Sequence, residues 1–308
     1  MNGVRRRMLA ALHRHPRIES LALLLPGGGW LAVFFAVPLA IMTSYAFRPR
    51  HVLGGVYPGW TTTHLQRLFE PLYLDVLRRS VVLSLVATAL ALLVSYPIAL
   101  VIVRATRWRA TLIFLVVLPF WTSFLIRTYA TMFMLRDTGA INQLLQFVGV
   151  IREPLRMLYT PGAVLFGLVS GFVPFMVLPI YASLEKLDPA LLEAAEALGA
   201  TEWRRFLRVT WPLSLPGVGA GSLLVFVPAL GSFLTSDLLG GAKVELIGNL
   251  VQSQFTSARN WPFGSALSFL LLIVVMVGMI GRIAMSREAS GLRPKAKGER
   301  PQPLGLRP

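Results

Sequence analysis

Long apolar blocks with almost no charge are the feature that most constrains this sequence. At about 1.5 Å per residue, a helical block of some 18 residues or more covers the roughly 30 Å hydrocarbon core of a bilayer. Because lipid offers no hydrogen-bond partner to the backbone, such blocks must be helices. The sequence therefore predicts an all-α integral membrane protein with six transmembrane helices, at residues 29–47, 80–103, 110–134, 161–184, 213–234 and 263–285.

The first apolar stretch, residues 21–47, is longer than the core of a cleaved signal peptide, so we expect it to remain as a span. Pro26 and the glycines at 27–29 predict a break between a short interfacial segment and the crossing itself. We expect a basic N-terminal tail at 1–20, a membrane domain at 21–285 and a disordered C-terminal tail at 286–308.

The chain is 55% hydrophobic, carries a net charge of +16 and has no cysteine. The positive charge of a membrane protein is typical of cytoplasmic loops, so we expect no nucleic-acid partner. Loops and tails on one side of the predicted membrane hold 19 Lys and Arg residues, against 10 on the other. This bias predicts that both termini and the loop between the fourth and fifth spans are cytoplasmic.

No motif for bond-breaking chemistry occurs in the sequence. It has no G-x-x-x-x-G-K-[ST] phosphate loop, no H-E-x-x-H metal pair and no G-x-S-x-G nucleophile. The acidic residues fall in tails, loops or span ends, where they could not bind a coupling ion within a span. We expect a chain that is not an enzyme, holds no metal and has no energy source of its own. A self-sufficient channel or secondary carrier is the alternative class.

Arg127 is the one clear charge within a block. On a straight helix it would lie about 24 Å from Thr111, near the outer interface. We therefore expect its side chain to snorkel there, with a pore-facing role as the alternative. Asp237 is the acid nearest a path position, and an ordinary helix-end role competes with that interpretation.

A charged segment, "EAAEALGATEWRRFLRVTWPLSLPG" at 193–217, interrupts the apolar blocks. Asp188 and Pro189 predict a helix start, Gly199 a left-handed turn, and Thr201 the cap of a second helix. An amphipathic pair lying on lipid headgroups is one interpretation of this helix, turn and helix. The spacing of one residue set resembles the cytoplasmic signature of permease subunits of ATP-binding cassette importers: Glu193, Ala194, Ala195, Gly199, Val209, Trp211 and Pro212. Trp211 departs from the leucine that is usual in that family.

That resemblance implies that residues 185–212, here called the coupling segment, dock into a groove of a separate ATPase. Glu193 with Ala194 and Ala195 would face the ATPase, and Gly199 would supply the bend. It further implies a bacterial inner-membrane assembly with a second permease, two ATPase copies that bind ATP and Mg, and a periplasmic solute-binding protein. This chain would itself bind no cofactor and would contact membrane lipid.

Four stretches are similar to the first permease subunit of spermidine/putrescine importers: residues 118–130, 139–145, 178–201 and 237–243. The resemblance implies a polyamine substrate, and an opine or amino-acid derivative is the alternative within the class. With no acid inside the spans, aromatic faces and backbone carbonyls near the proline kinks at Pro119, Pro174 and Pro228 are the groups that could host its ammonium ions. The candidates for the path are Phe120, Trp121, Phe172, Phe175, Phe226 and Phe233, with Asp237 at its outer end.

Overall fold

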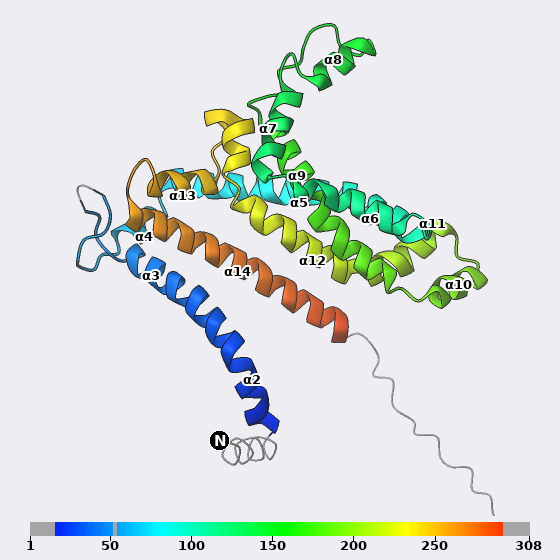
Figure 1. The fold of residues 1–308 in the computed structure, drawn as a ribbon, viewed down its shortest axis with the longest axis horizontal. Helices are drawn as coiled ribbons and strands as arrows, with labels where there is room; N and C mark the ends of the chain where they lie inside the picture. The colour runs from blue at the N-terminus through cyan, green and yellow to red at the C-terminus, as the bar shows by residue number, and fades with distance from the viewer. Residues whose placement is uncertain (1–15, 52–53, 292–308) are drawn as a thin grey trace, which may run out of the picture. The chain divides into compact units, whose positions relative to one another are not determined.

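The computed structural model describes residues 16–51 and 54–291, and the side chains of 24–51, 54–241 and 243–281. These residues are almost entirely helical (Figure 1), and the one β-bridge among them joins Arg50 to Val56. Contacts divide the chain into two units, Met1–Arg79 with Leu246–Leu271, and Ser80–Glu245 with Leu272–Pro308. Helices α5 (Pro71–Arg104) and α14 (Trp261–Gly291) each have residues in both units.

The first unit is centred on Phe263, whose side chain is fully buried at the start of α14. The Tyr73 ring lies 4.8 Å from the Phe263 ring, and the Arg67 guanidinium lies 4.8 Å from it. Arg50 donates a 2.8 Å hydrogen bond to the Ala258 carbonyl, which ties the first loop to the turn before α14. The remaining elements of this unit are α2 (Pro16–Leu31), η1 (Ala32–Ala36), α3 (Val37–Ala46), α4 (Thr63–Arg67) and α13 (Ile247–Phe255).

The second unit is built around α9 (Pro161–Glu185) and α12 (Trp211–Leu230), which lie side by side (Figure 1). Gly217 of α12 contacts the Pro179 carbonyl so closely that an added Cβ would lie 2.5 Å from it. At Gly221 an added Cβ would lie 3.1 Å from the Met176 carbonyl. These small residues permit the close approach of the two backbones. The other elements are α6 (Arg109–Val117), η2 (Leu118–Trp121), α7 (Phe124–Leu135), α8 (Ala140–Phe147), α10 (Pro189–Ala197), α11 (Glu202–Arg205), η3 (Phe206–Thr210), η4 (Ser236–Gly240) and η5 (Gly241–Lys243).

Five described helical segments are long and apolar enough to cross a membrane, and counting one bent pair as a span gives six. The predicted all-α membrane fold is therefore confirmed. The fifth predicted block ends earlier than expected, because α12 stops at Leu230. The predicted C-terminal tail begins too early, since α14 continues to Gly291. The rest of that tail and residues 1–15 of the N-terminal tail lie outside the described residues.

The predicted break at Pro26 and the following glycines is wrong, because helix continues from α2 through η1 into α3. Glycine and proline are tolerated in an apolar helix when the backbone has no better hydrogen-bond partner than itself. The irregularity lies instead at Ala32–Ala36, a π-turn that ends two residues before Pro38. A proline ring clashes with the carbonyl four residues earlier, and a wider turn at that point relieves the clash.

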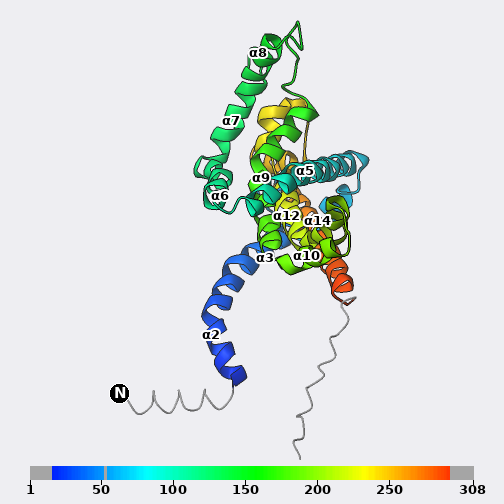
Figure 2. The same ribbon diagram turned by 90° about the vertical axis from the view of Figure 1, so that its right-hand side faces the viewer.

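The prediction of one straight third span, 110–134, is also wrong. The segments Arg109–Trp121 and Phe124–Phe147 meet at a bend of 94° (Figure 2). Pro119 lies in the short 3-10 turn at the bend, and the Thr122 hydroxyl donates a 2.7 Å hydrogen bond to the Pro119 carbonyl. Thr122 itself has extended backbone angles, so the helix stops and restarts at Phe124.

Candidate functional site

The first half of the coupling segment has the predicted local structure. The Asp188 carboxylate accepts a 2.9 Å hydrogen bond from the Ala190 N–H, and Pro189 occupies the first turn of α10. Gly199 has φ +77°, in the left-handed region that favours glycine, and nothing lies within 4 Å of the position of an added Cβ. The turn therefore depends on the backbone freedom of glycine and not on packing around it.

The second half joins the following transmembrane helix without a gap. The Thr201 hydroxyl accepts a hydrogen bond of 3.4 Å from the Arg204 N–H, which caps α11 as predicted. Helix then continues through the π-turn η3 into α12. As in the first span, the π-turn ends two residues before a proline, here Pro212. No break in the helix therefore separates α11 from α12.

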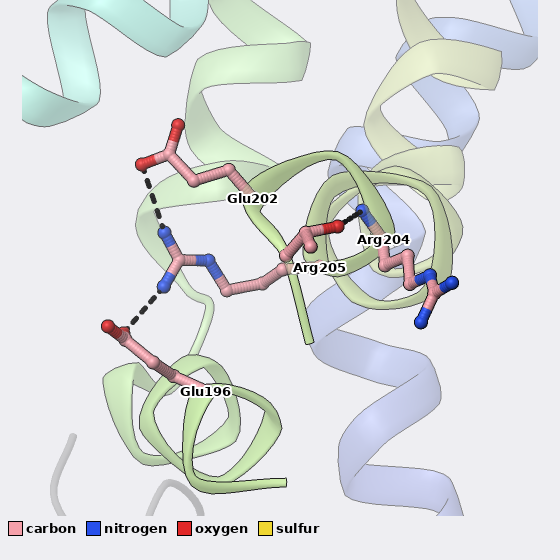
Figure 3. A network of polar contacts seen from close by, with 5 residues as sticks. Glu196, Glu202, Arg204 and Arg205 are labelled. Atoms are coloured by element: carbon pink, nitrogen blue, oxygen red, sulfur yellow. Dashed lines mark hydrogen bonds and ion pairs between the residues drawn. The ribbon is translucent and has the colours of Figure 1, made fainter. Parts of the chain in front are cut away.

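Arg205 links the two halves across the glycine turn (Figure 3). Its guanidinium lies 2.8 Å from a Glu196 oxygen on α10 and 3.6 Å from a Glu202 oxygen on α11. The Arg204 side chain points away from this pair of carboxylates. Sequence reasoning did not identify Arg205 as a site residue, because the link depends on how the Gly199 turn folds α11 back toward α10.

The signature residues of this segment differ in their exposure. Glu193 and Ala194 are exposed and Ala195 is half-buried. Among the described side chains no ion pair is formed by Glu193, whereas Glu196 and Glu202 both pair with Arg205. Glu193 is thus the carboxylate of α10 that stays available to another protein. Further along, Val209 is half-buried and Pro212 is exposed.

A cluster of aromatic rings connects the coupling segment to α5. The Tyr96 ring lies 5.7 Å from Phe206 and 5.1 Å from Trp211, and the Trp203 ring stacks at 5.5 Å from Phe206. Trp211, the departure from the family signature, therefore fills this cluster. The contact was not predicted because it requires α5 and α12 to be adjacent. A lone tyrosine inside an apolar block was the available signal, since a buried hydroxyl needs a polar partner.

An ion pair forms a second connection next to the coupling segment, at the C-terminal end of α9. Arg109, at the start of α6, lies 3.0 Å from a Glu185 oxygen, and it also donates a 3.1 Å hydrogen bond to the Val103 carbonyl. Because α6, α5 and α9 meet at this residue, the helices next to the coupling segment are held together by side chains that sequence reasoning had placed in loops.

Several predicted path residues come together where α6, α7 and α9 meet. The Phe120 and Phe175 rings lie 4.7 Å apart, and the Phe172 and Phe175 rings 6.1 Å apart. The Arg127 guanidinium lies 5.3 Å from the Phe120 ring and 5.7 Å from the Phe124 ring. A cation of the chain itself therefore already lies over the Phe120 ring, in the kind of position that a substrate ammonium would take.

Arg127 does not have the position that a straight helix would give it. Beyond the 94° bend it is half-buried and turned onto α9, where its Nη1 approaches the Gly171 carbonyl at 3.5 Å. The helix geometry on which the snorkelling prediction rested is therefore wrong. In contacting the chain's own aromatic rings and backbone, the guanidinium is partly shielded from lipid.

The remaining path candidates are Trp121, Phe226, Phe233 and Asp237. The Trp121 side chain is 76% exposed and lies 5.8 Å from the Phe114 ring, while Phe226 is a half-buried residue of α12. Phe233 is partly exposed after the end of α12, and Asp237 lies in the separate turn η4. Within the described residues no group of three or more His, Cys, Asp or Glu side chains could hold a metal ion. The role of these residues in a path stays a prediction.

Comparison with known proteins agrees with this geometry. Residues 144–287 match the family model described as binding-protein-dependent transport system inner membrane component. The chain is 44% identical over 248 residues to the spermidine/putrescine transport system permease protein PotB of Escherichia coli (strain K12), which covers 80% of this chain and 90% of that protein. It is also 44% identical over 247 residues to PotB of Haemophilus influenzae, covering 80% of this chain and 86% of that protein.

The fold is likewise similar to a solved structure, a bacterial alginate ABC transporter in complex with an alginate pentasaccharide-bound periplasmic protein. The TM-score is 0.67 at 21% identity, over 92% of this chain and 98% of that one. Helices, signature segment and relatives agree: the chain belongs to the family of inner-membrane permeases of binding-protein-dependent transport systems.

Proposed function

We propose that this chain is one permease subunit of a bacterial ATP-binding cassette importer that moves spermidine or putrescine into the cytoplasm. The observation that carries the proposal is the 44% identity to PotB over nearly the full length of that protein. The chain contributes membrane helices and a docking segment, and hydrolysis of ATP takes place on a partner. An opine or amino-acid derivative is the competing substrate within the same class.

The coupling segment is the proposed contact with the ATPase. Its support is Glu193, which is exposed and forms no ion pair with the described side chains, on a capped helix that Arg205 fixes against α11. A short rigid helix docked in a groove acts as a lever when the groove moves. Two ATPase copies would hold the ATP and Mg, one on this subunit and one on a second permease of similar build.

Orientation and the outer partner follow from the same proposal. The excess of Lys and Arg on one side supports a cytoplasmic coupling segment and cytoplasmic termini. A periplasmic solute-binding protein would deliver the substrate on the opposite side, as the alginate transporter's description suggests by analogy. Up to six spans make half of a path, which supports a second permease.

The position of the Arg127 guanidinium over the Phe120 ring limits the route that a polyamine could take. Because Arg127 repels ammonium groups, we propose that the substrate passes aromatic faces away from this guanidinium, with Phe226 and Phe233 as the leading candidates. Substituting leucine for each should raise the KM for putrescine uptake several-fold more than the same change at Trp121, which lies near the Arg127 cluster and is 76% exposed.

Uptake of labelled putrescine and spermidine tests the function in cells that lack their own polyamine importers and express this chain with its ATPase, second permease and binding protein. We expect saturable uptake that unlabelled polyamine competes away and that octopine or amino acids do not. Competition by an opine alone would instead assign the alternative substrate. Transport by the chain reconstituted without an ATPase would favour the self-sufficient carrier.

The coupling role has its own test at Gly199. Because its φ is +77° and an added Cβ meets no atom, Gly199→Asn should be tolerated and Gly199→Val should not. Asparagine adopts left-handed angles readily and a β-branched residue does not. The valine variant should reach the membrane in normal amounts yet lose most ATP-driven uptake. Equal uptake by both variants would contradict the role of this turn.

A further inference from the structure

A cavity of about 530 Å³ lies at the N-terminal end of α9, between the loops on either side of α8 and the turn η5. Its charged and polar lining comes from three separate segments and includes Arg136, Asp137, Arg156, Tyr159, Thr160 and Lys243. None of these residues belongs to the coupling segment or to the predicted path. We refer to this cavity as the cationic pocket.

Three cations and one carboxylate give the cationic pocket a net charge of about +2. Within the described residues, no ion pair is formed by Arg136, Arg156 or Lys243, and all three are exposed. By contrast, Arg78 and Arg79 of the first loop both pair with Asp75.

The positive end of a helix adds to this field. Thr160 caps α9, accepting a 3.2 Å hydrogen bond from the Ala163 N–H, and α9 is 25 residues long. The dipole of such a helix favours anions at its N-terminus. Like charges gathered around one cavity repel each other, and a bound anion relieves that repulsion.

The loops that carry these cations are fixed in place. Asn142 donates hydrogen bonds to the Arg136 carbonyl (3.1 Å) and the Leu155 carbonyl (3.0 Å), and its own oxygen accepts one from the Leu155 N–H (2.9 Å). The Tyr159 N–H donates to the Leu239 carbonyl at 2.9 Å, which joins the α9 end to η4. A pre-arranged set of cations loses little entropy when it binds an anion.

Helix α9 fixes which side of the membrane the pocket faces. The pocket lies at its first residue and the coupling segment follows its last, so they are separated by about 37 Å of helix, at about 1.5 Å per residue. That length exceeds the hydrocarbon core. If the coupling segment is cytoplasmic, as the proposed function requires, the cationic pocket opens on the periplasmic side.

We infer that the cationic pocket receives carboxylate side chains of the periplasmic solute-binding protein, and so positions that protein on the permease. This inference rests on the proposed function. A polyamine cannot be the ligand, because the pocket carries the same sign of charge. Exposed arginines reach outward and can bind carboxylates in a bidentate manner, which suits a protein surface that must dock and release.

Binding of the solute-binding protein encoded with this permease, measured on the complete transporter in nanodiscs of neutral lipid, tests the inference. We expect Arg156→Gln and Lys243→Gln each to weaken binding by roughly three- to ten-fold at low ionic strength, and much less in high salt. Asp137→Asn, which removes the one negative charge of the pocket, should strengthen binding. Stronger binding by Asp137→Asn could not result from damaged folding, which would weaken binding.

Arg152→Gln is the matched control, because Arg152 is an exposed cation of the same loop that does not line the pocket. Equal effects of Arg152→Gln and Arg156→Gln, or unchanged binding in the pocket variants, would overturn the inference while leaving uptake and the proposed function intact. Loss of binding that appears only when anionic lipid is added would assign the pocket to lipid headgroups instead. Failure of the unmodified transporter to bind any solute-binding protein would count against the proposed function itself.

Discussion

The Tyr96 hydroxyl of α5 lies 2.8 Å from the Ser214 hydroxyl of α12, and both side chains are buried. Ser214 uses its own proton to donate to the Trp211 carbonyl at 2.9 Å, so Tyr96 must be the donor of the bond between them. This chain of two hydrogen bonds fixes α5 to the first turn of α12, next to the coupling segment. A polar link inside apolar helices has only one satisfactory geometry, so it sets the register of the two helices.

The direction of that bond predicts unequal effects of removing its two ends. Tyr96→Phe leaves Ser214 with its Trp211 partner and should lower the free energy of unfolding by about 1 kcal/mol. Ser214→Ala leaves a buried phenol without an acceptor and should cost more, about 1–3 kcal/mol. Thermal unfolding of the purified protein in detergent measures both. The double variant should resemble Tyr96→Phe, and additive losses would contradict the assigned direction.

Arg205 gives a prediction about coupling that is separate from stability. Its partners Glu196 and Glu202 are largely exposed, so Arg205→Gln should change the free energy of unfolding by less than about 1 kcal/mol. The variant should nevertheless lose several-fold in substrate-stimulated ATP hydrolysis by the assembled transporter, because α10 is no longer fixed to α11.

Arg204→Gln is the control for this experiment, since Arg204 is the adjacent exposed cation and turns away from both carboxylates. Arg204→Gln removes one positive charge, as Arg205→Gln does, but it breaks neither ion pair. Similar loss of coupling in the two variants would mean that net charge, and not the bridge across Gly199, is what matters.

Local signals explain why the coupling segment could be predicted from the sequence. Asp188, Gly199 and Thr201 each act within three residues of their own position, through a side-chain cap or a permitted backbone angle. Such features require no knowledge of the rest of the fold. The path and the cationic pocket are different, because each is assembled from segments far apart in the chain.

The third span shows where sequence reasoning fails. Hydropathy shows that residues 110–134 are apolar but not whether the helix axis changes direction within them. The 94° bend at Pro119 and Thr122 was therefore not predicted, and the expected position of Arg127 rested on a straight helix. A proline followed by Thr-Ser in an apolar block was the available signal, since each can compete with helical hydrogen bonds.

Close packing of α9 on α12 predicts that Gly217 cannot be enlarged. An alanine Cβ there would lie 2.5 Å from the Pro179 carbonyl and 2.5 Å from the Ser183 Cβ, so the helices must separate. Gly217→Ala should destabilise the protein by about 1–3 kcal/mol, the usual cost of overpacking. Its midpoint of thermal unfolding in detergent is the measurement.

Gly278→Ala is the matched control for Gly217→Ala, since nothing within 4 Å would meet its Cβ and alanine is the better helix former. This variant should be neutral or slightly more stable. If Gly217→Ala were equally harmless, α9 and α12 would not be as close as described.

His64 gives a prediction about pH. Burial lowers its pKa below the ordinary value of 6.5, and the nearby Arg67 and Arg50 lower it further, against a raising effect of a backbone hydrogen bond at Arg48. Between that lowered pKa and 6.5 the unfolded chain binds the proton and the folded chain does not, so stability rises with pH. The stability that neutral, buried His64 contributes is therefore complete above about pH 6.5 and is lost as the pH falls through the folded-state pKa.

Thermal unfolding in detergent between about pH 5 and 8 measures this effect. The unfolding midpoint should decline on acidification, and His64→Gln should flatten that decline. Arg67→Gln should make that decline smaller, because removing a neighbouring cation moves the folded-state pKa of His64 back toward 6.5. A decline that persists unchanged in His64→Gln would assign the pH dependence to other groups.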